Sequence, residues 1–463
     1  MYQAIITALR NVREHPNADR LRLATCCGDQ VVVGLDNYEG QLGAYFPADG
    51  CISERMAFEN NLNSNPKENK DQERKGFFGK NRRVRAQNLR QEKSYGFWAE
   101  LDSLAWTEVA TEELEEGLQF TALNGQEVCK KYINPATLRR AGSNKQNGEK
   151  LSTKLKKRFS NLKEHSDTKQ LRYEINRIPD GSIIYLTEKA HGISGRSGHV
   201  KGLIPLTRKQ LWWNKWMGWT GKVYTSESEY RVVSGSRRVV LDPDQKTDEG
   251  FYSGKIFRID IHRSLEEAGI LKGLTLYYEI VGFDETGAAI MSGQSIEKIG
   301  DKKLRKLMKQ KYGDEMTYSY GCEYDDPEPS RRYDIFVYDI TFTNEDGDSW
   351  RLSWPLIKSI CRNLGVFHVP EIGCGRWDYK APEDSRDENP FFEYVQSFLD
   401  EDSTIDSRHI IEGLCARIQA PNGEIYILKD KGFAFKVLEG IVKSDDSIID
   451  TEEAEDLAAE EIE

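Results

Sequence analysis

The most informative segment of this chain is IIYLTEKAHG, residues 183–192. Its first four residues, Ile, Ile, Tyr and Leu, predict a buried strand that ends shortly before Lys189. A strand end fixes the position of the lysine, and Gly192 would let the backbone turn close to a ligand. A lysine attacks as a nucleophile only when unprotonated, so its ordinary pKa of about 10.4 must be lowered by cations or a metal. Further positive charge is therefore expected beside Lys189.

A second cationic segment lies near the C-terminus, in EIYILKDK at residues 424–431. Because side chains alternate along a strand, Lys429 and Lys431 are expected on one face together with Ile425 and Ile427. Two cations on one face suit the α-phosphate of a nucleotide, which they would neutralise while it is attacked. The alternative, for this segment taken alone, is an exposed strand with a solvated lysine pair.

Four further residues have the chemistry to bind a nucleotide or a metal. Glu279 stands in the apolar strand YYEIVGF, where a carboxylate is costly unless it meets a sugar hydroxyl or a metal-bound water. Glu412 opens another strand and suits Mg²⁺ near phosphate. In DIFVYDITF, Phe336 and Tyr338 share a face, and an aromatic ring there could stack on a purine. Arg237 or Arg238 offers a guanidinium for phosphate. Salt bridges, for the glutamates, and core packing, for the tyrosine, are the alternatives.

Length and pattern predict a multidomain α+β protein. The 463 residues allow two or three domains, and no run approaches the roughly 18 apolar residues of a membrane span. Residues 1–115 hold short β-type runs between Gly, Asp and Asn turns, which predicts a small β-barrel. A basic linker is expected at 116–172, followed at 173–443 by a domain rich in antiparallel sheet. Helical or loop insertions into that domain are expected at 204–222, which contains four tryptophans, at 297–330 and at 370–405.

The net charge of −11 is concentrated at one end of the chain. Asp445 to Glu463 carry ten acidic groups and no basic one, so the remainder is near −1. We expect residues 444–463 to form a disordered acidic tail. The N-terminus shows no secretory signal, which indicates a cytoplasmic protein. The eight cysteines form no CxxC pair, so neither disulfides nor a structural zinc site are expected.

Six segments follow one another in an order that matches a known set of motifs. They are KAHG at 189–192, GSRR at 235–238, EIVG at 279–282, FVYDI at 336–340, EGLCAR at 412–417 and LKDKG at 428–432. With them the chain resembles the ATP-dependent RNA ligases of the covalent nucleotidyltransferase superfamily. The resemblance implies that Lys189 is the nucleophile and that Glu412 organises the metal. It also implies that the residues that bind ATP or AMP are His191, Gly192, Arg237, Glu279, Tyr338, Lys429 and Lys431.

His191 narrows the resemblance to RNA ligases, because DNA ligases and capping enzymes of this pattern prefer Asp there. The sequence departs from the family at Tyr338, where Phe is usual, and at Ile193-Ser194, which replaces the commoner Thr-Ser or Thr-Asn. Neither departure removes a group that the chemistry requires, although the affinity for adenine could shift.

The N-terminal region carries a second resemblance. HPNADRL at 15–21 and AYFP at 44–47 resemble the OB-fold of tRNA-binding modules and of the Deinococcus-type RNA ligases, in which this barrel precedes the transferase domain. The implied architecture is an N-terminal OB-fold β-barrel followed by a nucleotidyltransferase domain of ATP-grasp-like antiparallel sheets with helices. Basic residues interleaved with aromatics suit RNA, although a solvated charge run is the alternative. The arginines expected at the RNA are Arg82, Arg83, Arg85 and Arg90.

The expected activity is ATP-dependent joining of RNA 3′-hydroxyl and 5′-phosphate ends through lysyl-AMP and RNA-adenylate, for RNA repair or nick sealing. ATP and Mg²⁺ or Mn²⁺ are the expected cofactors, RNA or an RNA-containing duplex is the expected partner, and a monomer is expected. Two alternatives stay open at this point. One is an mRNA guanylyltransferase or DNA ligase with the same lysyl-nucleotide chemistry, and the other is a non-catalytic RNA- or tRNA-binding OB protein.

Overall fold

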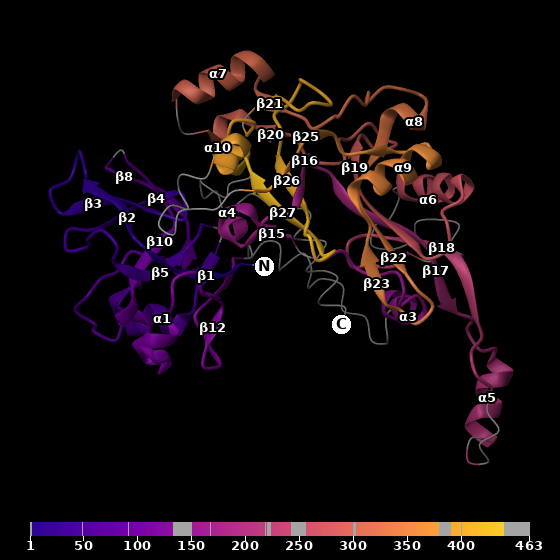
Figure 1. The fold of residues 1–463 in the computed structure, drawn as a ribbon, viewed down its shortest axis with the longest axis horizontal. Helices are drawn as coiled ribbons and strands as arrows, with labels where there is room; N and C mark the ends of the chain where they lie inside the picture. Colours follow the sequence, from indigo (N-terminus) through magenta and orange to yellow (C-terminus); the bar gives the residue numbers. More distant parts are fainter. Residues whose placement is uncertain are drawn as a thin grey trace.

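The computed structural model describes residues 2–48, 50–90, 92–132, 151–166, 168–217, 219, 224–241, 256–299, 302–378, 390–399 and 401–438. The chain is a mixed α+β protein with several antiparallel sheets, which confirms the predicted class (Figure 1). The acidic tail at 444–463 and much of the basic linker, residues 133–150, lie outside the described residues. Their expected character stays a prediction.

The N-terminal unit, at the left of Figure 1, consists of small antiparallel sheets. Its strands are β1 (Ala4–Ala8), β2 (Arg10–Glu14), β3 (Leu21–Cys26), β4 (Asp29–Gly34), β5 (Leu42–Phe46), β6 (Gly50–Ile52), β7 (Arg83–Val84), β8 (Ala86–Leu89), β9 (Glu92–Tyr95), β10 (Phe97–Glu100), β11 (Gln119–Phe120), β12 (Ala122–Leu123), β13 (Gln126–Glu127) and β14 (Cys129–Lys131). They form the sheets β10-β5-β1-β11, β2-β3-β4 and β14-β6-β7 and the hairpins β8-β9 and β12-β13. Within the described part of this unit the pairing does not join these strands into one closed barrel.

Two larger sheets make up the rest of the chain (Figure 1). The first has the order β15-β27-β26-β16-β25, with β15 (Lys169–Gln170), β16 (Ile183–Lys189), β25 (Glu371–Arg376), β26 (Gly413–Gln419) and β27 (Ile425–Lys431). The second has the order β18-β17-β19-β22-β23, with β24 beside β22; its strands are β17 (Ile193–Leu203), β18 (Ser228–Gly235), β19 (Leu274–Gly282), β22 (Tyr333–Thr343), β23 (Ser349–Arg351) and β24 (Phe367–His368). A small pair, β20 (Gln294–Ser295) and β21 (Glu315–Met316), stands apart.

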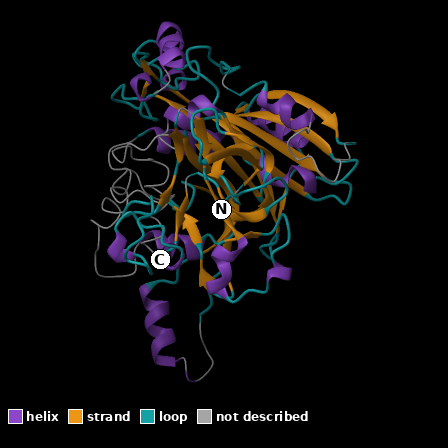
Figure 2. Cartoon of the chain, turned by 90° about the vertical axis from the view of Figure 1, so that its left-hand side faces the viewer, coloured by secondary structure: helices purple, strands orange, loops and turns teal. Residues whose placement is uncertain are grey.

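Helices cover these sheets or extend from them (Figures 1 and 2). They are α1 (Glu54–Glu59) in the N-terminal unit, then α3 (Leu151–Arg158), α4 (Leu171–Glu174), α5 (Arg208–Met217), α6 (Phe257–Ala268), α7 (Lys302–Tyr312), α8 (Pro329–Arg332), α9 (Trp354–Leu364), α10 (Pro390–Gln396) and α11 (Phe433–Leu438). Helix α6 buries Phe257, Ile261 and Leu265, one residue per turn, against the second sheet. None of the described helices is long and apolar enough to span a membrane.

Short-range patterns explain most of these elements. The segment Pro421-Asn422-Gly423 contains Asn-Gly, a strong hairpin signal, and it joins two antiparallel strands: Gly423 takes φ +87° and β26 pairs with β27. The insertions expected at 204–222 and 297–330 contain α5 and α7. The insertion expected at 370–405 is wrong for Glu371–Arg376, which form β25 and pair with β16. This edge strand is mostly exposed, so it lacks the apolar alternation that reveals a half-buried strand.

One arginine joins the two parts of the chain. Arg172 in α4 forms an ion pair with Asp29 of the N-terminal unit, and its guanidinium also lies 4.0 Å from a carboxylate oxygen of Asp430 in β27. Its side chain is 13% exposed. Asp430 also accepts a hydrogen bond from the side chain of Gln396 at 2.7 Å. The strand that carries Lys429 and Lys431 is thus tied to the N-terminal unit on the side opposite the lysines.

Candidate active site

The register of three strands gathers the predicted lysines. Lys189, the last residue of β16, lies opposite Gly413 in β26, and Gly413 lies opposite Lys431 in β27. One step along the strands, Cys415 lies between Thr187 and Lys429 in the same way. Residues two apart share a face of a sheet, so the three lysines project from one face. The convergence expected from the sequence is therefore present.

Glu412 occupies the centre of this lysine cluster. Its Oε1 lies 2.8 Å from Nζ of Lys189 and 3.0 Å from Nζ of Lys431, while its Oε2 lies 3.4 Å from Nδ1 of His191. The Glu412 side chain is 2% exposed and those of the two lysines are 21% exposed. Burial opposes ionisation of Glu412, but Lys189, Lys431 and His191 outweigh it and hold its pKa well below its usual value. The site is an ionised carboxylate held among cations.

Aromatic packing holds His191 in place. Its backbone N–H donates to the hydroxyl of Tyr320 at 2.6 Å, and its ring meets those of Tyr318 and Phe435 edge-on at 4.6 and 4.9 Å between centroids. The adjacent Gly192 packs closely against the second sheet. A Cβ there would come within 2.5 Å of the carbonyl oxygen of Ile280, so in this structure the close approach is to β19.

Glu279 and Tyr338 face the same point of the second sheet. Glu279, 9% exposed, lies opposite Ser194 across β17 and β19. The hydroxyls of Ser194 and Tyr338 are 3.4 Å apart. The two residues assigned to ribose and adenine thus approach one serine near the start of β17. That strand follows Lys189 and the end of β16 after a short connection, so the second sheet continues directly from the lysine cluster.

A histidine outside the predicted site completes the surroundings of Tyr338. His165 comes from the segment expected to be a linker, and its ring meets Tyr338 edge-on at 5.1 Å. Its Nε2 lies 2.8 Å from the carboxylate of Asp339, to which Nε of Arg351 also donates at 2.6 Å. Burial alone would raise the pKa of Asp339, but His165 and Arg351 lower it below its usual value. No sequence signal singled out His165, because its partners stand more than 170 positions away.

Three buried arginines were also missed. Arg196 lies opposite Gly235 and Tyr277, two pairs along β17 from the pair that Ser194 makes with Glu279. Arg258 donates to the carbonyl of Ser194 at 3.4 Å. Arg417 donates to the hydroxyl of Thr187 at 3.2 Å, and its guanidinium lies 4.2 Å from the ring centroid of Trp354. Each is at most 3% exposed. A cation among the small residues of SGRSG, or inside EGLCAR, is the signal that could have revealed two of them.

The predicted Arg237 and Arg238 lie in the turn that follows β18. Gly235 pairs with Val240 across this turn, and both arginines are half-buried. Gly235 also lies opposite Arg196, so the turn stands at the end of the second sheet that carries Ser194 and Glu279. Their expected phosphate contact stays a prediction.

The donor set suits a metal that arrives with its substrate. Among the described residues, no group of three or more His, Cys, Asp or Glu side chains could hold a metal ion. Mg²⁺ commonly keeps several waters and takes only one or two carboxylates together with substrate phosphates. Glu412, ionised, buried and beside two lysines, offers one such carboxylate. The geometry fits a magnesium nucleotide better than a permanently bound ion.

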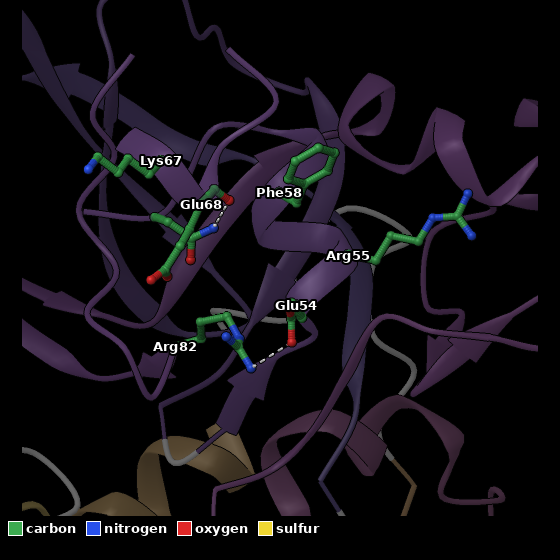
Figure 3. A pocket seen from close by; sticks show the side chains of 7 residues that line it. Glu54, Arg55, Phe58, Lys67, Glu68 and Arg82 are labelled. Carbon is green, nitrogen blue, oxygen red and sulfur yellow. Dashed lines mark hydrogen bonds and ion pairs between the residues drawn. The ribbon is translucent and has the colours of Figure 1, made fainter. Parts of the chain in front are cut away.

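The predicted RNA-binding arginines lie on β7, its flanks and the β8–β9 turn. Arg82 lies 3.8 Å from the carboxylate of Glu54, and the guanidinium of Arg83 lies 4.3 Å from the ring centroid of Tyr132. Arg85 is half-buried, and Arg90 is exposed in the turn. A hollow beside α1 is lined by residues of both charges (Figure 3), namely Glu54, Arg55, Phe58, Asn63, Lys67, Glu68 and Arg82.

No family model matches this chain, and neither does any curated protein. Solved structures do match, among them several of the Naegleria gruberi RNA ligase. A lysine-to-alanine variant of the Naegleria gruberi RNA ligase with ATP and Mn is 16% identical, covers 96% of this chain and 99% of its own, and gives a TM-score of 0.52. An aspartate-to-alanine variant of the same ligase without ligand covers 93% and 96% at 16% identity and a TM-score of 0.51. At this identity the likeness establishes a shared fold over nearly the whole chain.

Proposed function

We propose that this chain is an ATP-dependent RNA ligase that forms a covalent lysyl-AMP on Lys189. The observation that carries the proposal is the placement of Lys189 and Lys431 around the buried carboxylate of Glu412. Similarity in fold to an RNA ligase whose structures hold ATP or AMP with Mn supports it. The six motifs in order support it independently.

In the first step, Nζ of Lys189 attacks the α-phosphorus of ATP. A phosphorus–nitrogen bond forms, the bond to the bridging oxygen breaks, pyrophosphate leaves and the amine gives up a proton. Lys429 and Lys431 neutralise the α-phosphate from the same sheet face. Glu412 would exchange its lysine partners for Mg²⁺ or Mn²⁺, which supplies charge neutralisation at the phosphates. Once that ion pair is lost, the Lys189 ammonium would release its proton to solvent, favoured by the cations beside it, and the resulting amine would attack.

The other site residues would bind the nucleotide itself. Glu279 would accept from the ribose hydroxyls and Tyr338 would stack on adenine, with Ser194 between them. Arg237 would contact ribose or phosphate, and His191 and Gly192 would border the phosphates beside Lys189. AMP then passes to an RNA 5′-phosphate, and a 3′-hydroxyl attacks the activated phosphate and releases AMP. Positioning and electrostatics carry such phosphoryl transfers.

The N-terminal unit would bind the RNA. We assign it to the OB-fold of the Deinococcus-type branch, on the residues at 15–21 and 44–47. Arg82, Arg83, Arg85 and Arg90 would contact the RNA backbone, because arginine pairs well with phosphate. We further propose that the enzyme is a cytoplasmic monomer that repairs RNA ends or seals nicks.

The direct test is covalent labelling. The full chain is incubated with α-³²P-labelled ATP and Mg²⁺ and separated by denaturing electrophoresis. The parent should retain label, and Lys189→Ala should lose it by at least about 10³-fold, because no other group replaces a missing nucleophile. Lys201→Ala is the matched control, since Lys201 lies on β17 in an exposed ion pair with Glu345 at 3.0 Å.

Two further arms of this test separate the rival enzymes. A chain that takes label from GTP in place of ATP would be a guanylyltransferase. Comparing the sealing of a nick in RNA with the sealing of a nick in DNA would show on which polymer the enzyme acts. Label that persists in Lys189→Ala would remove the proposed nucleophile. A parent chain that takes no label from either nucleotide would leave only nucleic-acid binding.

A further inference from the structure

Helix α5 places its tryptophans on the outside. The helix stands at the end of the long β17–β18 hairpin, away from the rest of the molecule (Figures 1 and 2). Within the helix, Trp212, Trp213 and Trp216 are 64%, 37% and 63% exposed. Trp219, two residues after the end of the helix, is 87% exposed. No residue of the helix is buried. Tryptophan is among the most buried residues on average, and an exposed cluster of this kind marks a binding surface.

Among the described residues of the extension, polar contacts join this helix to its return segment. The amide of Asn214 donates to the carbonyl of Tyr224 at 2.8 Å and accepts from its N–H at 2.7 Å. The hydroxyl of Thr207 accepts from the N–H of Gln210 at 3.3 Å and so caps the first turn. In the described part of the extension, Asn214 faces the return segment, whereas the rings of Trp212 and Trp216 face outward.

The charge of the extension identifies the class of ligand. No aspartate or glutamate stands between Glu188 and Glu227, although the whole chain carries 76 acidic and 65 basic residues. Arg208, Lys209 and Lys215 belong to the helix and are exposed. Cations next to aromatic rings are the combination by which proteins bind single-stranded nucleic acid.

The geometry of two rings supports the same ligand. Trp212 and Trp216 lie one helical turn apart with ring centroids separated by 6.0 Å and planes inclined by only 11°. Parallel, exposed indole faces can each receive a nucleobase, and every base has such a face to offer. A duplex hides these faces inside its stack, so unpaired nucleotides are the ones that fit.

We propose that the tryptophan face of α5 binds unpaired nucleotides of the RNA substrate by stacking, at a distance from the reacting ends. The proposal rests on the proposed function in that the substrate is RNA. The 11 residues of β17 start beside the active site, and at about 3.3 Å per residue they separate it from α5 by roughly 36 Å. At about 3.4 Å per stacked nucleotide, roughly ten nucleotides bridge that distance. Substrates with a single-stranded extension of this length would be preferred.

The test compares full-length parent and Trp212→Ala/Trp216→Ala chains. Fluorescence anisotropy with a labelled 20-nucleotide single-stranded RNA should show binding weakened about tenfold or more in the variant, since each stacked base contributes about 1–3 kcal/mol. Binding of a blunt RNA duplex should be unchanged. The Trp212→Phe/Trp216→Phe chain, which keeps two stacking rings, should retain most of the binding, and Leu211→Ala on the same helix is the matched control.

Covalent labelling with ATP separates this proposal from the proposed function. The tryptophan variant should label like the parent, because α5 lies away from Lys189. If the parent fails to label but its single-stranded RNA binding still depends on the tryptophans, the ligase proposal fails and the RNA surface stands. Equal RNA binding by parent and variant would overturn the RNA surface. The RNA surface would also be overturned if the tryptophan variant bound RNA like the parent and lost only binding to vesicles of phosphatidylcholine and phosphatidylserine. That result would make α5 a membrane contact.

Discussion

The active site and helix α5 each hold a residue type in an unusual environment. Lysines of the active site are largely buried, whereas tryptophans of α5 are largely exposed. Lys189 and Lys431 point into a site where their side chains are 21% exposed, whereas Trp212 and Trp216 are 64% and 63% exposed at the tip of a hairpin. Lysine is mostly exposed in proteins and tryptophan mostly buried. A residue held against its own solvation preference in an ordered element indicates a ligand, which here would be a nucleotide phosphate and a nucleobase.

The two regions differ in how the unfavourable placement is offset. In the active site the two ammonium groups are balanced by Glu412, so the charges stabilise one another even without a ligand. At α5 the cost of exposing the indole rings is offset, within the described part of the extension, by the stacking of Trp212 on Trp216. Removing a side chain should therefore disturb the fold and chemistry in the first region, and only binding in the second.

The largest effect is expected from Glu412→Gln. The amide keeps the shape but leaves two lysines without their anion and the metal without its carboxylate, so lysyl-AMP formation should fall by about 10³-fold. Labelling with ATP measures this. Glu424→Gln, exposed in the β26–β27 turn, is the matched control. A Glu412→Gln chain that labels at the parental rate would show that the carboxylate has no part in the reaction.

The pH dependence of stability gives a second readout for Glu412. Its folded-state pKa is depressed, so its contribution is present above the unfolded value near 4.5 and is lost as the pH falls through the folded value. The Glu412→Gln chain has no ionisable group at this position, so it lacks this contribution at every pH. The difference in Tm between parent and variant should thus be largest near neutral pH and shrink below about pH 4.5.

Two tryptophans test the contrast between the regions directly. Trp354 in α9 is 1% exposed beneath the guanidinium of Arg417, whereas Trp216 is 63% exposed. Trp354→Ala should lower the free energy of unfolding by about 3 kcal/mol through the cavity it leaves, and Trp216→Ala should change it by less than about 0.5 kcal/mol. Urea denaturation measures both. Equal losses would mean that α5 packs against the molecule in solution.

Local pattern predicted the strands and the lysine convergence. Strands β5, β16, β19, β22, β26 and β27 follow from apolar and β-branched runs, and alternation alone put Lys429 and Lys431 on one face. Register across strands then sets Lys189 beside Lys431, and the need for positive charge beside a lysine nucleophile had predicted that proximity. These features depend on neighbours in sequence or on one strand pairing, so the sequence could reveal them.

The missed features depend on distant partners or on burial. His165 reaches Asp339 from a segment expected only to be a basic linker. Arg417 is buried where Trp354 and Thr187 meet it from other elements. The sequence also could not predict whether the tryptophans of 204–222 face the core or the solvent, since four tryptophans close together suggest either one. The close contact of Gly192 with Ile280 in β19 also depends on a distant partner, whereas its expected approach to a ligand stays a prediction.

The smallest predicted effect concerns a buried carboxylate that contrasts with Glu412. Asp334 in β22 accepts a hydrogen bond from the N–H of Ile335 at 2.7 Å, and burial raises its pKa to about 6. Because the folded pKa exceeds the unfolded value of about 3.9, the associated stability is full below pH 4 and is lost as the pH rises through 6. Asp334→Asn keeps the accepting oxygen and cannot ionise. It should raise the free energy of unfolding by about 2 kcal/mol at pH 7.5 and leave it unchanged at pH 4.

Urea denaturation at the two pH values measures this difference, with Asp346→Asn in the exposed β22–β23 turn as the control. A gain at pH 7.5 that vanishes at pH 4 would show that a carboxylate buried without compensating cations weakens this fold, whereas Glu412 with its lysines does not. A loss of stability at pH 7.5 would mean that Asp334 is ionised and paired in the folded chain. Asp334 and Glu412 would then both be ionised in the folded chain, and the difference between them would lie in the ligand that each one contacts.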